Sequence, residues 1–129
     1  RGLGVQMQGL GRHVLAEVFG CEFHVLNDLD KIREILVSAA LTAGAEVRET
    51  AFHRFSPQGV SGVVVISESH IAIHTWPELG YAALDVFTCG ERVDPWVALD
   101  AIVKDFGSTN VTAQEMKRGV FLKSSECAG

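Results

Sequence analysis

The stretch "VSGVVVISESHIAIHTWPELGYAALDVFTC", Val60 to Cys89, decides the fold class of this chain. It contains three runs rich in β-branched, aromatic and other apolar residues: Val60 to Ile66, His70 to Trp76 and Tyr81 to Cys89. The segments "SES" and "PELG" separate these runs, and both are rich in residues that favour turns. Consecutive strands joined by short turns predict a largely antiparallel sheet.

The segments on either side extend the sheet. Upstream, Ala45 to Phe55 alternates charged and apolar residues as a half-buried strand does, and "SPQG" supplies the turn that follows it. Arg12 to Val18 is expected to be the first strand of the chain. Asn110 to Gly119 is expected to be the last one, before a loosely held tail from Val120 to Gly129.

Two segments have the apolar spacing of helices. The first follows Asn27 or Asp28, either of which can cap it, and ends at Gly44. The second begins at Asp94, an N-cap before a proline, and its apolar stripe ends at Gly107. The sequence therefore predicts two helices.

The order of these elements favours one α+β domain over residues 1–129, with two layers: a largely antiparallel sheet and two helices on one of its faces. The other face must be solvated, lined by a ligand or paired with a second subunit. In the expected strand from Tyr81 to Cys89, alternate residues share one face and include both polar and apolar side chains: Tyr81, Ala83, Asp85, Phe87 and Cys89. We therefore expect a cleft or a sandwich-forming dimer on this face of the sheet.

Composition excludes several classes of protein. Sixteen acidic residues stand against eleven scattered basic ones, which argues against a nucleic-acid partner. The apolar runs are far shorter than the ~18 residues that span a bilayer, so no membrane is expected. Three widely spaced cysteines, Cys21, Cys89 and Cys127, indicate a reducing, cytoplasmic location. Residues 1–6 lack the core of a signal peptide and are expected to be an extension before Met7.

The pair Glu68-Ser69 has chemistry that a strand does not need. The Ser69 hydroxyl can attack the Glu68 carbonyl, which moves the acyl group from nitrogen to oxygen. Loss of the Ser69 Cα proton then eliminates the ester, and hydrolysis of the resulting dehydroalanine leaves a pyruvoyl group. The elimination needs a base, and His74 is of the residue type that most often serves as one near neutral pH.

Strand geometry limits how these residues can meet. In a regular strand, Ser69 and His74 would be roughly 16 Å apart and on opposite faces. Either the chain turns sharply around Ser69, or His74 reaches it across a subunit boundary. A pyruvoyl carbonyl forms a Schiff base with an amine and accepts the electrons left when an α-amino acid loses carbon dioxide. A proton donor must follow, and Cys89 fits because a thiol is mostly protonated at neutral pH.

These motifs resemble those of a known family. "FHRFSPQGVSGVVVISESHIAIHTWPELGYAALDVFTCG", residues 52–90, and "MQGLGRHVLAEVFGC", residues 7–21, closely resemble prokaryotic S-adenosylmethionine decarboxylase proenzymes. The likeness extends to about Trp96 and fades after it. It implies autocatalytic cleavage between Glu68 and Ser69 into chains 1–68 and 69–129, the second of which begins with a pyruvoyl group.

The resemblance also implies roles for other residues. His74 would be the processing base, Ser61 would assist processing, and Cys89 would be the proton donor. Aromatic side chains would hold the adenine of S-adenosylmethionine and a glutamate would hold its ribose hydroxyls; the matching residues are Phe55, Trp76 and Glu78. The implied product is the aminopropyl donor for spermidine and other polyamines. The implied assembly is a homo-oligomer of processed subunits with active sites at or near the interface.

Two other functions stay open. Some relatives are pyruvoyl-dependent arginine or ornithine decarboxylases, so the motif determines the chemistry better than the substrate. Leu79 stands where relatives often have an aromatic residue, which bears on how the adenosyl part is held. The chain could instead be an unprocessed binding or regulatory module.

A metal site is a further alternative. His70 and His74, with Glu78 and Cys89 nearby, could be read as zinc ligands. Histidines four residues apart need a helix to reach one ion, and the β-branched residues around them oppose a helix, so no metal is expected.

The remaining conspicuous residues are expected to be structural. Cys21 and Cys127 are read as small apolar residues, and Trp96 and Phe106 as core residues of the second helix. The expected charges at the surface or at strand edges are Arg12, Arg48 and Arg54.

Overall fold

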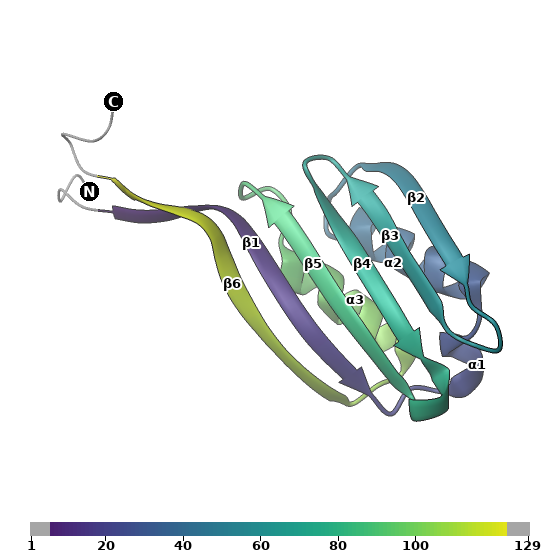
Figure 1. Cartoon of the computed structure of the whole chain (residues 1–129). Coiled ribbons are helices and arrows are strands. Elements are labelled where there is room, and N and C mark those ends of the chain that lie inside the picture. The colour runs from purple at the N-terminus through teal and green to yellow at the C-terminus, as the bar shows by residue number, and fades with distance from the viewer. Residues whose placement is uncertain (1–5, 124–129) are drawn as a thin grey trace.

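Six strands form one antiparallel sheet in the computed structural model, which describes residues 6–123 (Figure 1). The strands are β1 Gln6–Phe19, β2 Val47–Arg54, β3 Val60–Ile66, β4 Ser69–Trp76, β5 Tyr81–Cys89 and β6 Asn110–Lys123. The helices are α1 Phe23–Leu26, α2 Leu29–Thr42, the 3-10 turn η1 Pro77–Leu79 and α3 Pro95–Phe106. The order in the sheet is β2-β3-β4-β5-β1-β6, so β1 lies between β5 and β6.

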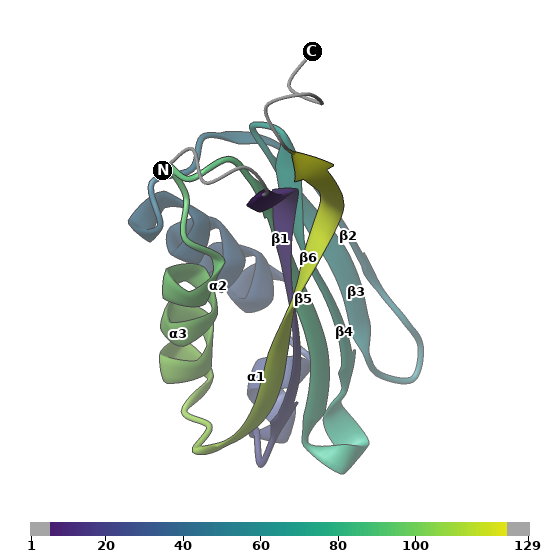
Figure 2. The ribbon, with the colours of Figure 1, turned by 90° about the vertical axis from the view of Figure 1, so that its left-hand side faces the viewer.

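The helices cover one face of the sheet and leave the other open (Figure 2). The predicted α+β class, the antiparallel sheet and the two helices on one face are therefore confirmed. The short helix α1 was missed, because four residues cannot show a helical period. Among residues 6–123, no helix is long and apolar enough to cross a membrane.

The core lies between the helices and the covered face of the sheet. Strand β5 shows the pattern most clearly, since every second residue is buried. Fully buried side chains of the helices, such as Leu36 and Ile102, meet strand residues such as Val14 and Ile71. Phe106 is buried, as expected. The alternate strand residues face the open side.

The helix ends follow the sequence signals. The Asp28 side chain accepts a hydrogen bond from the backbone N–H of Lys31, and Asp94 accepts one from that of Trp96. Gly107 ends α3 in the left-handed conformation, which glycine adopts without cost. Asp28, rather than Asn27, therefore caps α2.

The first and last strands are longer than the sequence indicated. Strand β1 begins at Gln6 and β6 runs to Lys123, so Val120 to Lys123 belong to the sheet and not to a loose tail. The two strands pair with each other from Gln6 and Lys123 to Phe19 and Asn110. This pairing continues β6 beyond Gly119, the glycine at which the sequence predicted its end. Residues 1–5 and 124–129, which include Cys127, lie outside the described residues.

Arg12 is also not the simple surface charge that was expected. Its guanidinium donates two hydrogen bonds to the Glu115 carboxylate, at 2.9 and 3.0 Å, from a half-buried position. Trp96, at the edge of the core, donates its indole N–H to the same carboxylate at 2.8 Å. Arg48 and Arg54 are exposed, as expected. Glu115 therefore ties β6 to both β1 and α3.

Candidate active site

The turn between β3 and β4 holds the predicted cleavage point. Ile66 pairs with Ser69, which leaves Ser67 and Glu68 as a two-residue hairpin turn. Glu68 has φ of 69°, the only positive φ of a non-glycine residue among those described. This conformation costs an ordinary side chain about 1 to 2 kcal/mol. The bond between Glu68 and Ser69 therefore follows a strained residue.

Ser69 lies against two of the groups that the predicted chemistry requires, the Glu68 carbonyl and the Cys89 thiol. Its hydroxyl donates to the Glu68 carbonyl oxygen, so Oγ is next to the carbonyl it would attack. The same Oγ is 3.4 Å from Sγ of Cys89. Antiparallel pairing explains this contact, because it sets the start of β4 beside the end of β5. Glu68, Ser69 and Cys89 are called the turn site below.

A second group of predicted residues lines a cavity of about 430 Å³ at the other end of β4. This cavity is called the slot below. It is lined by five of the predicted site residues together with four neighbours. These are Phe55, Ser61, His74, Trp76 and Glu78, with Pro57, Gln58, Gly59 and Thr75.

The strand register gives the slot its shape. The Phe55 N–H donates to the Gly59 carbonyl at 2.8 Å, and the pairing of Ser61 with His74 sets Gly59 beside Trp76. One cross-strand row thus runs from Phe55 through Gly59 to Trp76, and its middle member has no side chain. Two strand spacings are about 10 Å, which leaves room for one flat ring system between the two aromatic rings.

The floor of the slot is held by α1 and the residue after it. The buried Thr75 hydroxyl donates to the Leu26 carbonyl at 2.8 Å and accepts from the Val60 N–H at 2.9 Å. Asn27 Oδ1 accepts from the Gly59 N–H at 3.0 Å. The helix that sequence reasoning missed therefore supports the predicted binding residues.

Ser61 and His74 form a hydrogen-bonded pair at the edge of the slot. They are direct partners across β3 and β4, and Ser61 Oγ is 2.7 Å from His74 Nδ1. The His74 ring is exposed on the open face. When Nδ1–H donates to Ser61, the lone pair on Nε2 is left to accept a proton.

The structure does not bring His74 to Ser69 within one chain. Both belong to β4, five residues apart, which corresponds to roughly 16 Å and to opposite faces. A sharp turn does exist, but it precedes Ser69 and leaves both residues in the same strand. The expectation that such a turn unites them is therefore wrong for a single chain.

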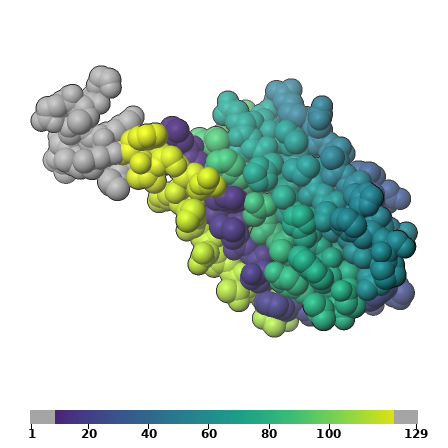
Figure 3. All heavy atoms as spheres, in the orientation of Figure 1, coloured from purple at the N-terminus to yellow at the C-terminus, as the bar shows by residue number. Residues whose placement is uncertain are grey.

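The open face lies between the two ends (Figure 3). It contains a groove of about 560 Å³ whose lining includes Ala83, Asp85 and Gln114. Large apolar side chains on this face remain partly exposed: Leu15, Phe19, Val65, Trp76 and Met116. The mixed face that the β5 alternation predicted is confirmed.

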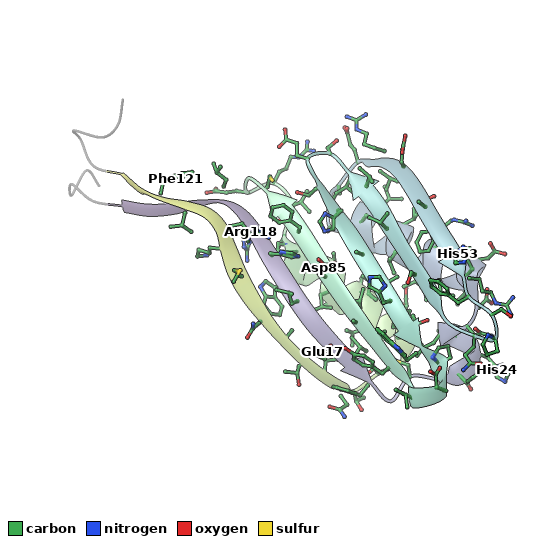
Figure 4. All side chains as sticks on the ribbon, viewed as in Figure 1. Glu17, His24, His53, Asp85, Arg118 and Phe121 are labelled. Atoms are coloured by element: carbon green, nitrogen blue, oxygen red, sulfur yellow. The ribbon has the colours of Figure 1, made fainter. Side chains whose placement is uncertain are left out.

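An ionic cluster on this face was not predicted. The His13 Nε2 and Asp85 carboxylate atoms are 2.6 Å apart, and His70 Nε2 is 3.5 Å from the same oxygen. Arg118 lies 3.0 Å from His13 Nδ1 (Figure 4). An arginine can only donate, so Nδ1 accepts and the Nε2–H of His13 donates to Asp85. In this arrangement His13 has no lone pair for a metal. The alternation of β1 and β5 was the signal that could have found the cluster.

Two other expectations can be compared with the geometry. His70 and His74 lie four residues apart in a strand, roughly 13 Å, and do not converge on one ion.

Leu79 is 68% exposed and is not among the residues that line the slot. Its replacement of an aromatic residue therefore leaves both aromatic walls of the slot in place.

Comparison with known proteins gives consistent findings. A family model described as S-adenosylmethionine decarboxylase matches residues 12–119. A protein of Carboxydothermus hydrogenoformans described as S-adenosylmethionine decarboxylase proenzyme is 67% identical, over 91% of this chain and 92% of its own. A protein of Pelotomaculum thermopropionicum with the same description is 68% identical over 88% and 90%. The crystal structure of the adenosylmethionine decarboxylase from Aquifex aeolicus VF5 has a TM-score of 0.83 and 34% identity, and the match covers 88% of this chain and 94% of that one.

Proposed function

Because this chain belongs to the S-adenosylmethionine decarboxylase family, its reaction is the decarboxylation of S-adenosylmethionine, and we propose that it uses a pyruvoyl group made from Ser69. The observation that carries the proposal is the contact of Ser69 Oγ with both the Glu68 carbonyl and Cys89. The description of the relatives as proenzymes supports processing of the chain. Their naming does not favour arginine or ornithine as the substrate.

The residues present can carry out the processing. Ser69 Oγ attacks the Glu68 carbonyl carbon, the C–N bond breaks, and the nitrogen takes up a proton as the ester forms. His74 of a second subunit would then remove the Ser69 Cα proton, and the ester oxygen would leave as the Glu68 carboxylate. Water hydrolyses the remaining dehydroalanine with release of ammonia, which leaves the pyruvoyl group.

The same residues fit the decarboxylation. The pyruvoyl carbonyl would supply the electron-accepting centre that the substrate amine engages. Cys89, beside position 69, would give a proton to the substrate Cα once carbon dioxide has left. The rings of Phe55 and Trp76 would hold the adenine between them and Glu78 would hold the ribose hydroxyls. A thiol in this role must stay reduced, which suits the cytoplasm.

The separation of the turn site from the slot favours a site shared by two subunits. They lie at opposite ends of β4, where Ser69 and His74 point to opposite faces, and the open face, which carries His74 and Cys89, exposes large apolar side chains. In a two-fold dimer the same surfaces face each other, so each end can meet the other end of the partner. Ser69 and Cys89 of one subunit would then join Ser61 and His74 of the other, and both sites would be completed at once.

Intact mass tests the cleavage directly. We expect two fragments divided between Glu68 and Ser69, with a pyruvoyl mass on the second. Ser69→Ala should stay full length and His74→Ala should be cut slowly. Ser67→Ala, which changes the neighbouring turn serine, is the matched control and should be cut like the parent. Active protein with an uncut chain and an ordinary serine at position 69 would refute the proposal.

The substrate is tested by carbon dioxide release. We expect release from carboxyl-labelled S-adenosylmethionine and little from labelled arginine or ornithine. A preference for either basic amino acid would show that the adenosyl assignment of the slot is wrong. An inactive, uncut chain would instead support a binding or regulatory role.

A further inference from the structure

A row of aromatic rings continues from the slot across the open face. Phe19 of β1 stacks on Tyr81 of β5 with ring centroids 5.2 Å apart and planes at 22°. Tyr81 stacks in turn on Trp76 of β4 at 5.2 Å and 25°. Both pairs have the offset, nearly parallel geometry that aromatic side chains favour. The three rings form one stack that ends at Trp76.

The stack occupies only one side of Trp76. Strand β4 lies between β3 and β5, and Tyr81, which pairs with Trp76, comes from β5. The slot lies on the other side, over β3, where the row holds Gly59. Phe55 stands across the slot, and the His53 ring meets its ring edge-on with centroids 4.6 Å apart. Each aromatic wall of the slot is therefore in contact with another ring.

A hydrogen bond fixes the middle ring of the stack. The Tyr81 hydroxyl donates to the carboxylate of Glu17, which lies on the open face at the end of β1 (Figure 4). This hydrogen bond, with a smaller contribution from burial, raises the pKa of Tyr81 to about 12. The phenol therefore stays protonated at neutral pH and keeps donating to Glu17.

We propose that Tyr81 is a positioning residue, which holds the Trp76 indole in the orientation that stacks on the adenine ring of the substrate. Phe19 stacks on the other side of Tyr81, and Glu17 holds its hydroxyl. This inference rests on the assignment of the slot to the adenosyl group. Trp76 is 39% exposed, so an indole without support on its β5 side is free to turn. A wall that is fixed before the ligand arrives loses less freedom when the ligand binds, and this strengthens binding.

The test measures binding in the Ser69→Ala chain, which stays intact and does not turn over. The ligand is 5′-methylthioadenosine, the nucleoside part of the substrate without its amino-acid arm, and the method is calorimetry. Loss of one stacking partner in Tyr81→Leu should raise the Kd by about 3- to 10-fold. Tyr81→Phe keeps the ring and should have a smaller effect, as should Phe19→Leu. Phe121→Leu changes an exposed aromatic residue of β6 outside the row and should leave the Kd unchanged.

Kinetics of the cleavable chain separate positioning from general damage. Tyr81→Leu should be cut like the parent and should raise KM by a factor similar to that for Kd, with kcat nearly unchanged. A fall in kcat with no change in KM would overturn the proposal. If Tyr81→Leu does not fold, Tyr81→Phe and Phe19→Leu decide, and an unchanged Kd in both overturns it.

Trp76→Leu distinguishes this inference from the function on which it rests. If Trp76→Leu binds the nucleoside as the parent does, the slot is not the adenosyl site and the substrate assignment fails. If Trp76→Leu binds weakly while Tyr81→Leu and Phe19→Leu match the parent, only the positioning role fails.

Discussion

Cys89 and Cys21 are in different environments, which suit different roles. Cys21 is 7% exposed and burial raises the pKa of its thiol, as is typical of an inert core cysteine. Cys89 is only partly buried and lies 3.4 Å from Ser69 Oγ. Proximity to the proposed catalytic group, rather than the thiol alone, therefore supports the proposal that Cys89 is the proton donor.

Replacing this thiol should separate processing from turnover. Cys89→Ala should still be cut between Glu68 and Ser69, because the attacking hydroxyl is unchanged. Carbon dioxide release should fall by about 10²- to 10⁴-fold, which is the usual contribution of a positioned acid. Cys21→Ala is the control and should keep the parent rate while it remains folded. A normal rate in Cys89→Ala would exclude the donor role.

At the scale of elements, β2 and β3 fit together through a glycine. The Phe52 ring of β2 lies over Gly62 of β3, and a Cβ on Gly62 would overlap with that ring. The ring also lies under the Arg33 guanidinium of α2, 5.4 Å from the ring centroid. Gly62 therefore allows the edge of the sheet to pack against α2.

Gly62→Ala should displace the Phe52 ring and destabilise the fold by about 1 to 3 kcal/mol, the usual cost of overpacking. The measurement is urea unfolding in the uncut Ser69→Ala chain. The same change made together with Phe52→Ala should cost clearly less, because the overlapping ring is gone. Equal costs in the two backgrounds would show that the overlap is not the cause.

Glu115 joins three elements and should make stability depend on pH. Hydrogen bonds from Arg12 and Trp96 lower its pKa from 4.5 to about 2. Because the folded pKa is lower than the unfolded one, the stabilisation is complete above about pH 4.5 and is lost as pH falls through 2.

Glu115→Gln should therefore lower the free energy of unfolding at pH 7 by about 2 kcal/mol in the uncut Ser69→Ala chain. The difference from the parent should shrink between pH 4.5 and pH 2. Glu91→Gln, a change of an exposed carboxylate, should stay within about 0.5 kcal/mol of the parent. A difference that does not vary with pH would contradict this explanation.

The strands and long helices were predictable because their signals are local. Alternation identified β5, and a capping aspartate followed by proline identified α3. Helix α1 has too few residues for a period, and the length of β1 depends on its pairing with β6. The site residues could be named from their motifs, but their division into two groups could not. It follows from the register of β4, which places Ser69 and His74 at different ends.

At the scale of the whole molecule, the two proposed half-sites lie at opposite ends of the sheet. The turn site and the slot are fixed on one rigid sheet, and neither can approach the other without breaking β4. The proposed function therefore requires a second copy of the chain to bring a turn site to the substrate held in the slot.

Mixed dimers test this arrangement. Ser69→Ala lacks the nucleophile but keeps His74, whereas His74→Ala has the opposite defect. When the two are co-expressed in equal amounts, random pairing places about half of the His74→Ala chains in dimers with one complete site. We expect these chains to be cut much faster than in the pure His74→Ala protein, as measured by intact mass. No acceleration would place the whole site within a single chain.

The position of β1 between β5 and β6 has a consequence for the life of the cut protein. The first fragment would carry β1, β2 and β3 and the second β4, β5 and β6, so three ladders, β3 with β4, β5 with β1 and β1 with β6, would join separate molecules. The fragments would be interleaved, and we expect these ladders to hold them together after cutting. Once denatured, however, they must find each other by diffusion, so recovery becomes a two-body encounter that slows on dilution. The uncut precursor would refold as a single molecule, at a rate that does not depend on concentration. Cleavage would therefore make unfolding much harder to reverse in dilute solution.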